Sequence, residues 1–186
     1  MRDRRSDSNT GAFDVVIVGA GFSGLYMHHR MRELGFAVRL YEAGEGVGGT
    51  WFWNRYPGAR CDIESVEYSY SFSEELQQEW QWSERYASQP EILRYLNHVA
   101  ERFDLHRDIQ LETRVTSATF DETGYRWTIE TDRGDRVSAR FCIMATGCLS
   151  SVNVPEFPGR DTFRGHRVTP HKLAHEQHRH QNRRAG

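Results

Sequence analysis

The sequence predicts an α/β fold built on a parallel sheet, and three observations predict it. An apolar, β-branched run at residues 13–18 has the length of a strand and ends at a glycine-rich turn. A helical stretch follows the turn, and residues 37–43 then form a second apolar run. A run that is apolar on both faces is typical of a central parallel strand. Strand, glycine turn, helix and strand in this order indicate a right-handed βαβ unit.

The first helix is expected at residues 22–34, because Gly35 follows at the position where glycine commonly ends a helix. Residues 44–65 are rich in glycine and aromatic residues and are expected to form an ordered loop. A second helix is predicted to begin at residues 88–91, which have the spacing of a capping box with proline in the first turn. Its apolar stripe continues to Phe103.

Three further strands are predicted near residues 109–120, 125–131 and 136–146. The sequences DETG and DRGD between them are good turn sequences. The strands therefore form a β-meander, and the last of them, FCIMAT, is again apolar on both faces. The predicted fold class is a Rossmann-like domain, a βαβ unit with a parallel sheet and an inserted β-meander.

Composition narrows the class of protein. The chain has 186 residues, of which 38% are hydrophobic and 27% charged, as in globular proteins. A net charge of −2 gives no general attraction to nucleic acid or to an acidic membrane. Three cysteines without a CxxC pair argue against a disulfide framework and for a reducing compartment. The sequence contains neither an apolar signal segment nor an apolar run long enough to span a membrane. We therefore expect a cytoplasmic protein with no membrane association.

Charge is distributed unevenly along the chain. Residues 1–159 carry a net charge of −7, whereas the last 27 residues carry +5 and five of the nine histidines. A segment with so few large apolar residues cannot offset its ordering entropy by burial. We therefore expect a disordered leader at 1–12, one domain at 13–159 and a disordered or aberrant basic tail at 160–186. We expect no metal site in the tail, although its histidine spacing would permit one.

The first motif with chemical meaning is Gly19-x-Gly21-x-x-Gly24, which follows a buried strand and opens a helix. In a dinucleotide-binding turn, the first glycine permits the tight turn and the second lets the backbone approach the pyrophosphate. The third allows close packing of helix and strand. The phosphates then face the N–H groups of the helix N-terminus, and Ser23 can add a hydroxyl contact. This spacing predicts a pyrophosphate site.

Glu42 ends the second strand, 18 residues after Gly24, where an acidic side chain binds the adenosine ribose. Its charge would repel a 2′-phosphate and so favours FAD or NAD over NADP; an exposed charge at a strand end is the alternative. The glycine-rich residues 44–49 and the flat rings of Trp51 and Trp53 follow. An NAD site would continue into a third βα unit, whereas this chain continues into a meander. The sequence therefore predicts FAD.

The motifs GAGFSGLY, YEAGEGVGGTWFWNRYPGARCDIES, QPEILRYLNHVAERF and ARFCIMATGCLS resemble the N-terminal FAD domain of Baeyer–Villiger monooxygenases. This family includes phenylacetone, cyclohexanone and steroid monooxygenases. The resemblance covers residues 13–159. Its most discriminating part is GGTWFWNRYPGARCD, because ordinary flavin-containing monooxygenases share the glycine fingerprint and GG-x-W but not the run from Asn54 to Asp62.

The resemblance implies a set of residues that bind the cofactor. The implied pyrophosphate and ribose contacts are Gly19, Gly21, Ser23, Gly24, Glu42, Ala145, Thr146 and Gly147. The implied contacts to the flavin are Gly49, Thr50, Trp51, Trp53 and Tyr68, with Arg60, Cys61 and Asp62 near the flavin ring and the nicotinamide. Val115 is implied to meet the adenine through its backbone.

Asp62 is the implied catalytic residue, because in this family an aspartate here supports an arginine of the NADPH domain that pairs with the peroxyflavin. A surface ion pair between Arg60 and Asp62 is the alternative. Cys61, Cys142 and Cys148 are expected to be small packing residues.

In enzymes of this family, NADPH reduces FAD, and the reduced flavin takes up O₂ to give a peroxyflavin. The peroxyflavin then converts a ketone into an ester or lactone. The resemblance stops soon after Gly165, where the family continues with FxGxxxHxxxWP and a second glycine fingerprint for NADPH. Thr169 stands at the histidine position and Leu173-Ala174 at the Trp-Pro positions. The NADPH site is thus expected to be missing and the fragment inactive. The alternatives to this function are a flavin-containing N- or S-monooxygenase and a flavin-binding module without turnover.

Overall fold

The computed structural model describes residues 10–149 and 153–165 of the chain. The chain forms two compact units. The first unit lies within Met1–Gly49 and Leu96–Gly147, and the second within Thr50–Tyr95 and Cys148–Gly186. Most of the predicted leader and tail lie outside the described residues, as do the tail's histidines. Among the described residues, no group of histidine, cysteine or acidic side chains could hold a metal ion.

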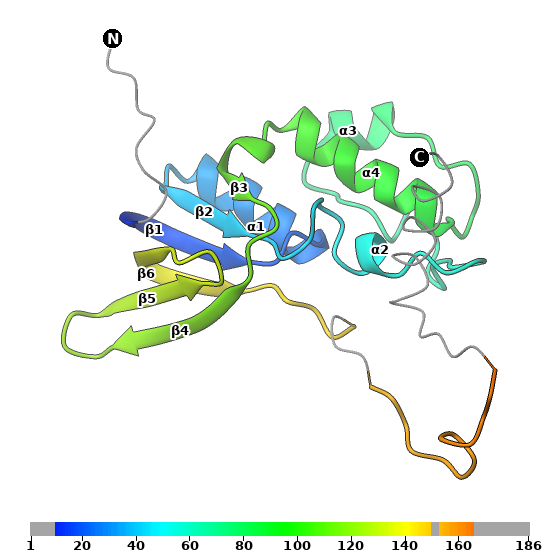
Figure 1. Ribbon diagram of the computed structural model, residues 1–186. Coiled ribbons are helices and arrows are strands. Elements are labelled where there is room, and N and C mark those ends of the chain that lie inside the picture. Colours follow the sequence, from blue (N-terminus) through cyan, green and yellow to red (C-terminus); the bar gives the residue numbers. More distant parts are fainter. Residues whose placement is uncertain (1–9, 150–152, 166–186) are drawn as a thin grey trace, which may run out of the picture. The chain divides into compact units, whose positions relative to one another are not determined.

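The first unit contains a six-stranded sheet in the order β3-β2-β1-β6-β5-β4 (Figure 1). The strands are β1 (Thr10–Val18), β2 (Val38–Tyr41), β3 (Ile109–Gln110), β4 (Val115–Asp121), β5 (Arg126–Thr131) and β6 (Arg136–Met144). Strands β3, β2, β1 and β6 pair in parallel, whereas β6, β5 and β4 pair antiparallel. Helix α1 (Phe22–Glu33) joins β1 to β2 and contacts both. The predicted βαβ unit and meander are confirmed.

Two boundaries differ from the prediction. β1 begins at Thr10 rather than residue 13, because residues 10–12 pair with β6, so the end of the predicted leader is part of the sheet. The strand predicted at 109–120 is two strands, β3 and β4. Glu112 lies between them with a φ of 50°, a left-handed conformation that interrupts an extended strand. β3 pairs with β2 and β4 pairs with β5.

The core of the first unit forms around β1. Val15, Val16 and Ile17 are fully buried, which confirms that this apolar run is a central strand. Tyr41 and Ile129 pack with Val16, so the meander adds to the core. Each fully buried aliphatic side chain contributes about 1.5–3 kcal/mol.

The second unit contains α2 (Thr50–Trp53), α3 (Glu74–Glu79) and the start of α4 (Gln89–Arg102), which ends in the first unit. α4 matches the predicted second helix. Its predicted capping box does not form as expected, because the Glu91 carboxylate accepts hydrogen bonds from the backbone N–H and the hydroxyl of Ser83. α2 and α3 were not predicted, and α2 lies in the expected loop at 44–65. The hydroxyl of Ser73 accepts a hydrogen bond from Leu76 N–H and caps α3.

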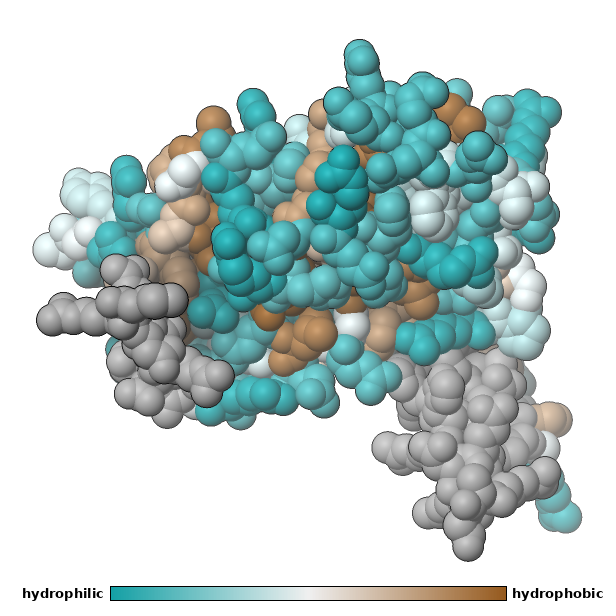
Figure 2. Space-filling model, turned by 90° about the horizontal axis from the view of Figure 1, so that it is seen from above, coloured by the Kyte–Doolittle hydropathy of each residue, from teal (hydrophilic) through white to brown (hydrophobic). Residues whose placement is uncertain are grey.

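The surface is mainly hydrophilic on the face shown in Figure 2, with hydrophobic residues visible between the polar ones. Among the described residues, no helix has both the length and the apolar character needed to cross a bilayer.

His28 is a buried titratable residue on α1. Its side chain is 0% exposed, and neither ring nitrogen has a hydrogen-bond partner within the described chain. Its Nε2 lies 3.7 Å from Asp108 Oδ2, too far for a hydrogen bond. Burial lowers the pKa of His28 to about 4, and Arg32 and Arg107 also lower it, against the opposing effect of Asp108. His28 is therefore neutral in the folded protein at neutral pH.

This burial makes stability depend on pH. The unfolded chain takes up a proton at His28 near pH 6.5, whereas the folded protein resists protonation until about pH 4. The free energy of unfolding should therefore fall as the pH is lowered from 6.5 to 4, by about 3 kcal/mol from this residue alone. Urea unfolding of the wild type and of His28→Leu across this range measures the difference. The variant should lose less stability than the wild type, and equal losses would refute the assignment.

Candidate functional site

The glycine fingerprint forms the turn between β1 and α1. Gly19 has a φ of 103°, and a Cβ there would lie 2.6 Å from the carbonyl oxygen of Ala145. A Cβ on Gly24 would lie 1.9 Å from the carbonyl oxygen of Gly19. Both positions therefore require glycine, Gly19 for backbone conformation and contact and Gly24 for contact alone. The steric roles predicted for these two glycines are confirmed.

The N-terminus of α1 begins at this turn. Gly21 is the N-cap residue, with extended backbone angles, and no side chain caps the helix. The first turn contains no acidic residue. A 12-residue helix therefore presents its first N–H groups and the positive end of its dipole without a competing side-chain acceptor. This arrangement suits a phosphate group. Ser23 lies in the same turn and is exposed.

Residues 44–49, the glycine strap, lie against the fingerprint. Gly48 N–H donates a 2.9 Å hydrogen bond to the carbonyl of Ala20. Gly49 has a φ of 52°, and a Cβ there would lie 2.8 Å from the Cα of Gly21. The two glycine-rich segments thus pack backbone to backbone. A side chain on Gly49 would push the two segments apart, whereas a Cβ on Gly21 would lie 3.5 Å from the Cα of Gly49, an ordinary contact distance.

Glu42 is buried, with 5% of its surface exposed, and it joins these two segments. Its Oε2 accepts a 2.8 Å hydrogen bond from Ala20 N–H, and its Oε1 accepts one of 2.8 Å from Gly44 N–H. The alternative of an exposed charge at a strand end is therefore wrong. Each carboxylate oxygen keeps a further lone pair that can accept from a ribose hydroxyl.

The remaining residues predicted for the first unit lie beside these segments. Thr113 N–H donates to the carbonyl of Glu42 at 2.8 Å, and Val115 begins β4 two residues later. Ala145 N–H donates to the carbonyl of Val18 at 2.9 Å, which holds the end of β6 beside the fingerprint. Thr146 and Gly147 follow and are exposed.

In the second unit, the predicted flavin contacts Trp51 and Tyr68 form a pair. The indole N–H of Trp51 donates to the Tyr68 hydroxyl at 3.1 Å, and the rings meet edge to face at 5.9 Å. Burial raises the pKa of Tyr68, so its hydroxyl is protonated at neutral pH. Trp53 packs edge to face against Phe52 at 5.2 Å.

The segment from Arg60 to Asp62 is held by a neighbouring loop of the same unit. Arg60 forms a 2.6 Å ion pair with Glu84 and also donates to the carbonyl of Tyr86. The predicted alternative, an ion pair between Arg60 and Asp62, is therefore wrong. Asp62 is exposed and makes no hydrogen bond or ion pair with any residue that the structure describes. Its carboxylate is available to a partner.

The cysteines differ in their surroundings. Cys61 is buried and Cys142 half-buried, in agreement with packing roles, but Cys148 is exposed, so the packing prediction is wrong for that residue. All three are free thiols.

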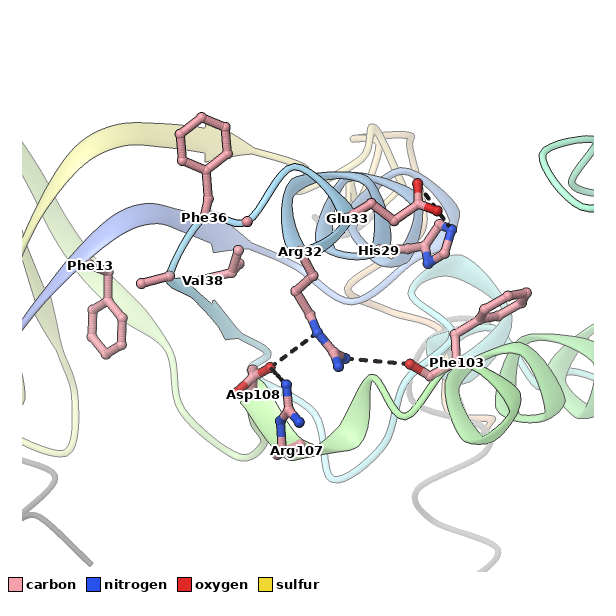
Figure 3. Close-up of a pocket in the computed structure, with 11 residues that line it drawn as sticks. Phe13, His29, Arg32, Glu33, Phe36, Val38, Phe103, Arg107 and Asp108 are labelled. Atoms are coloured by element: carbon pink, nitrogen blue, oxygen red, sulfur yellow. Dashed lines mark hydrogen bonds and ion pairs between the residues drawn. The ribbon is translucent and has the colours of Figure 1, made fainter. Parts of the chain in front are cut away.

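A hollow lies at the other end of the parallel strands (Figure 3). It has a volume of about 610 Å³ and is lined by the start of β1 and β2 and the end of α1. Arg32 crosses this hollow and binds the carbonyl of Phe103 and the carboxylate of Asp108. None of the predicted cofactor residues lines it.

The sequence predicts only a helix-capping segment at Gln89, yet the side-chain amide of this residue donates to the backbone carbonyl of Trp51. Glutamine in the first turn of a helix is common, so the sequence contains no signal for this contact.

Known proteins that are similar to this chain include a matching family model and several monooxygenases. A family model described as pyridine nucleotide-disulphide oxidoreductase matches residues 16–182. Acetone monooxygenase (methyl acetate-forming) of Gordonia sp. strain TY-5 is 49% identical, and phenazine N-monooxygenase of Lysobacter antibioticus is 48% identical. Each alignment covers 160 residues, 86% of this chain and 30% of the relative. This chain thus spans about a third of the length of these relatives.

Solved structures give the same result. Steroid monooxygenase bound to NADP is 66% identical, with a TM-score of 0.77 over 81% of this chain and 29% of that protein. Cyclohexanone monooxygenase in a closed form is 45% identical, with a TM-score of 0.79 over 84% of this chain and 30% of that protein.

Proposed function

Because this chain belongs to the pyridine nucleotide-disulphide oxidoreductase family and resembles Baeyer–Villiger monooxygenases over about a third of their length, we propose that it binds FAD. The observation that carries the proposal is the buried Glu42 carboxylate beside a helix N-terminus without a side-chain cap. The carboxylate accepts hydrogen bonds from ribose hydroxyls, and the helix N-terminus receives the pyrophosphate.

The residues that bind the adenosine and pyrophosphate come from the first unit. Gly19, Gly21 and Gly24 let the backbone approach the phosphates, and Ser23 adds a hydroxyl donor. The strap supports the fingerprint through Gly48 and Gly49. Val115 contacts the adenine through its backbone, and residues 145–147 cover the pyrophosphate. The burial of Glu42 supports FAD over a nucleotide with a 2′-phosphate, because a second anion there would be repelled.

The residues that line the flavin come from the second unit and the residue before it. These are Gly49, Thr50, Trp51, Trp53 and Tyr68, with Arg60, Cys61 and Asp62 near the reacting ring. Asp62 acts as the supporting carboxylate for a cationic side chain supplied by another part of the protein. Its exposed carboxylate without a partner in the described chain supports this role.

The longer protein that this chain represents acts as a monooxygenase that uses NADPH and O₂ to convert a ketone into an ester or lactone. FAD supplies the redox and oxygen chemistry, while the residues above bind it, orient it and balance its charge. NADPH and the ketone bind to parts beyond this chain. The three free cysteines support a reducing, cytoplasmic compartment.

Oxidation at nitrogen is a second candidate for the longer protein. The relative named phenazine N-monooxygenase is as similar to this chain as the acetone monooxygenase. Turnover of ketones and of aromatic amines by a full-length relative would separate the two functions.

The FAD proposal is tested by mixing the purified chain with FAD, removing free FAD by gel filtration and recording the absorption spectrum. The chain should retain flavin, and NADPH should not reduce it rapidly. A chain that retains no flavin would contradict FAD binding, and rapid bleaching by NADPH would contradict the assignment of NADPH binding to other parts.

A further inference from the structure

Gln89 connects the start of α4 to two separated points of the segment that precedes Asp62. Its side chain is buried, with 7% exposed, and its amide donates to the backbone carbonyl of Trp51. Its backbone N–H donates to the carbonyl of Ala59 at 2.9 Å. Burying a side-chain amide without a hydrogen-bond partner costs free energy. The hydrogen bond to the Trp51 carbonyl therefore fixes the position of the Gln89 side chain.

The carbonyl of Trp51 needs this partner because α2 is only four residues long. Helices this short are unstable alone and leave their carbonyls without partners inside the helix. The carbonyl of Thr50 accepts from Asn54, and that of Phe52 accepts from Arg55. Gln89 supplies the partner for the carbonyl between them. The backbone of α2 therefore depends on a side chain 38 residues away.

The orientation of the Trp51 indole follows from this backbone. The indole is buried and bonded to Tyr68, so it has little freedom to compensate for a shift of its own backbone. We propose that Gln89 is a positioning residue for the flavin, acting through the Trp51 carbonyl to fix the Trp51–Tyr68 pair. This proposal rests on the proposed function, in which Trp51 and Tyr68 line the flavin.

Glu91 provides a matched control within the same helix turn. It is also buried, but its carboxylate binds Ser83 and does not contact α2. Glu91→Gln should lower stability without changing the surroundings of Trp51. Gln89→Leu removes the donor, and Gln89→Glu replaces it with a carboxylate that faces the carbonyl. When that carboxylate is protonated, it regains a donor at nearly the same position.

The test has an arm without flavin. Deuterium uptake by a peptide covering residues 50–55 is measured in the FAD-free chain for the wild type, Gln89→Leu and Glu91→Gln. The amide of Asn54, bonded to Thr50, reports on α2. Uptake should become several-fold faster in Gln89→Leu and stay unchanged in Glu91→Gln. Unchanged uptake in Gln89→Leu would overturn the proposal, whether or not the chain binds FAD.

The second arm uses FAD. Gln89→Leu should weaken FAD binding by up to about tenfold, because FAD must then order an α2 that has lost one hydrogen bond, and it should change the visible circular dichroism of bound FAD. The spectrum of Gln89→Glu should match that of Gln89→Leu at pH 7.5 and approach that of the wild type at pH 5.5. This pH dependence tests the proposal even if Gln89→Leu does not fold. Wild-type affinity and spectra in both variants would overturn the proposal. A wild type that binds no FAD would refute the proposed function, while peptide exchange would still report on Gln89.

Discussion

Gly24→Ala is expected to cause a large loss of stability in the first unit. The added Cβ would lie 1.9 Å from the carbonyl oxygen of Gly19 and 2.9 Å from its carbonyl carbon, both backbone atoms that cannot rotate away. The helix must then move from β1, which would lower the free energy of unfolding by about 3 kcal/mol, the upper range for overpacking. FAD binding should be lost at the same time. Urea unfolding followed by circular dichroism measures the effect.

Gly35→Ala is the matched control for this substitution. Gly35 has a φ of 82°, and nothing lies within 4 Å of an added Cβ. The cost there is conformational only, about 1 kcal/mol. Equal losses in the two variants would show that close packing at Gly24 is not the cause.

Glu42→Ala is expected to lower stability by a similar amount. It removes both acceptors from the N–H groups of Ala20 and Gly44 and leaves these groups buried without partners. The free energy of unfolding should fall by about 3 kcal/mol, because both hydrogen bonds are charge-assisted. FAD affinity should fall about a hundredfold, since the ribose contact and the loop geometry are lost together. Urea unfolding and FAD titration measure the two effects.

Glu45→Ala controls for the loss of a negative charge in the same loop. Glu45 is exposed, so its removal should change stability by less than about 0.5 kcal/mol. Glu42→Gln should fall between Ala and the wild type, because its amide keeps one acceptor but turns a donor toward a backbone N–H. A Glu42→Ala protein as stable as Glu45→Ala would contradict the bridging role of Glu42.

Those parts of the fold that depend on local pattern were predictable from the sequence. The apolar run of β1, the glycine at the end of α1 and the turns of the meander each carry a local signal. The short helix α2 carries none, because it has only four residues and the carbonyl of Trp51 takes its partner from Gln89, 38 residues away. The break at Glu112 was also missed, because it comes from pairing β3 with one neighbour and β4 with another.

The same distinction applies to the candidate site. The tight turn at Gly19, the close packing at Gly24 and the position of Glu42 after β2 were predictable, because they depend on spacing along one βαβ unit. The partner of Arg60 was not, because Glu84 comes from a loop 24 residues later. The sequence offered the nearer acid, Asp62, only as an alternative partner. The structure leaves that carboxylate without a partner among the described residues.

Isothermal titration calorimetry of the folded chain with FAD and, separately, with NADP⁺ tests the central claim most directly. The account predicts that FAD binds and that NADP⁺ does not, because the buried Glu42 carboxylate would repel a 2′-phosphate. Tight binding of NADP⁺ without any affinity for FAD would contradict it.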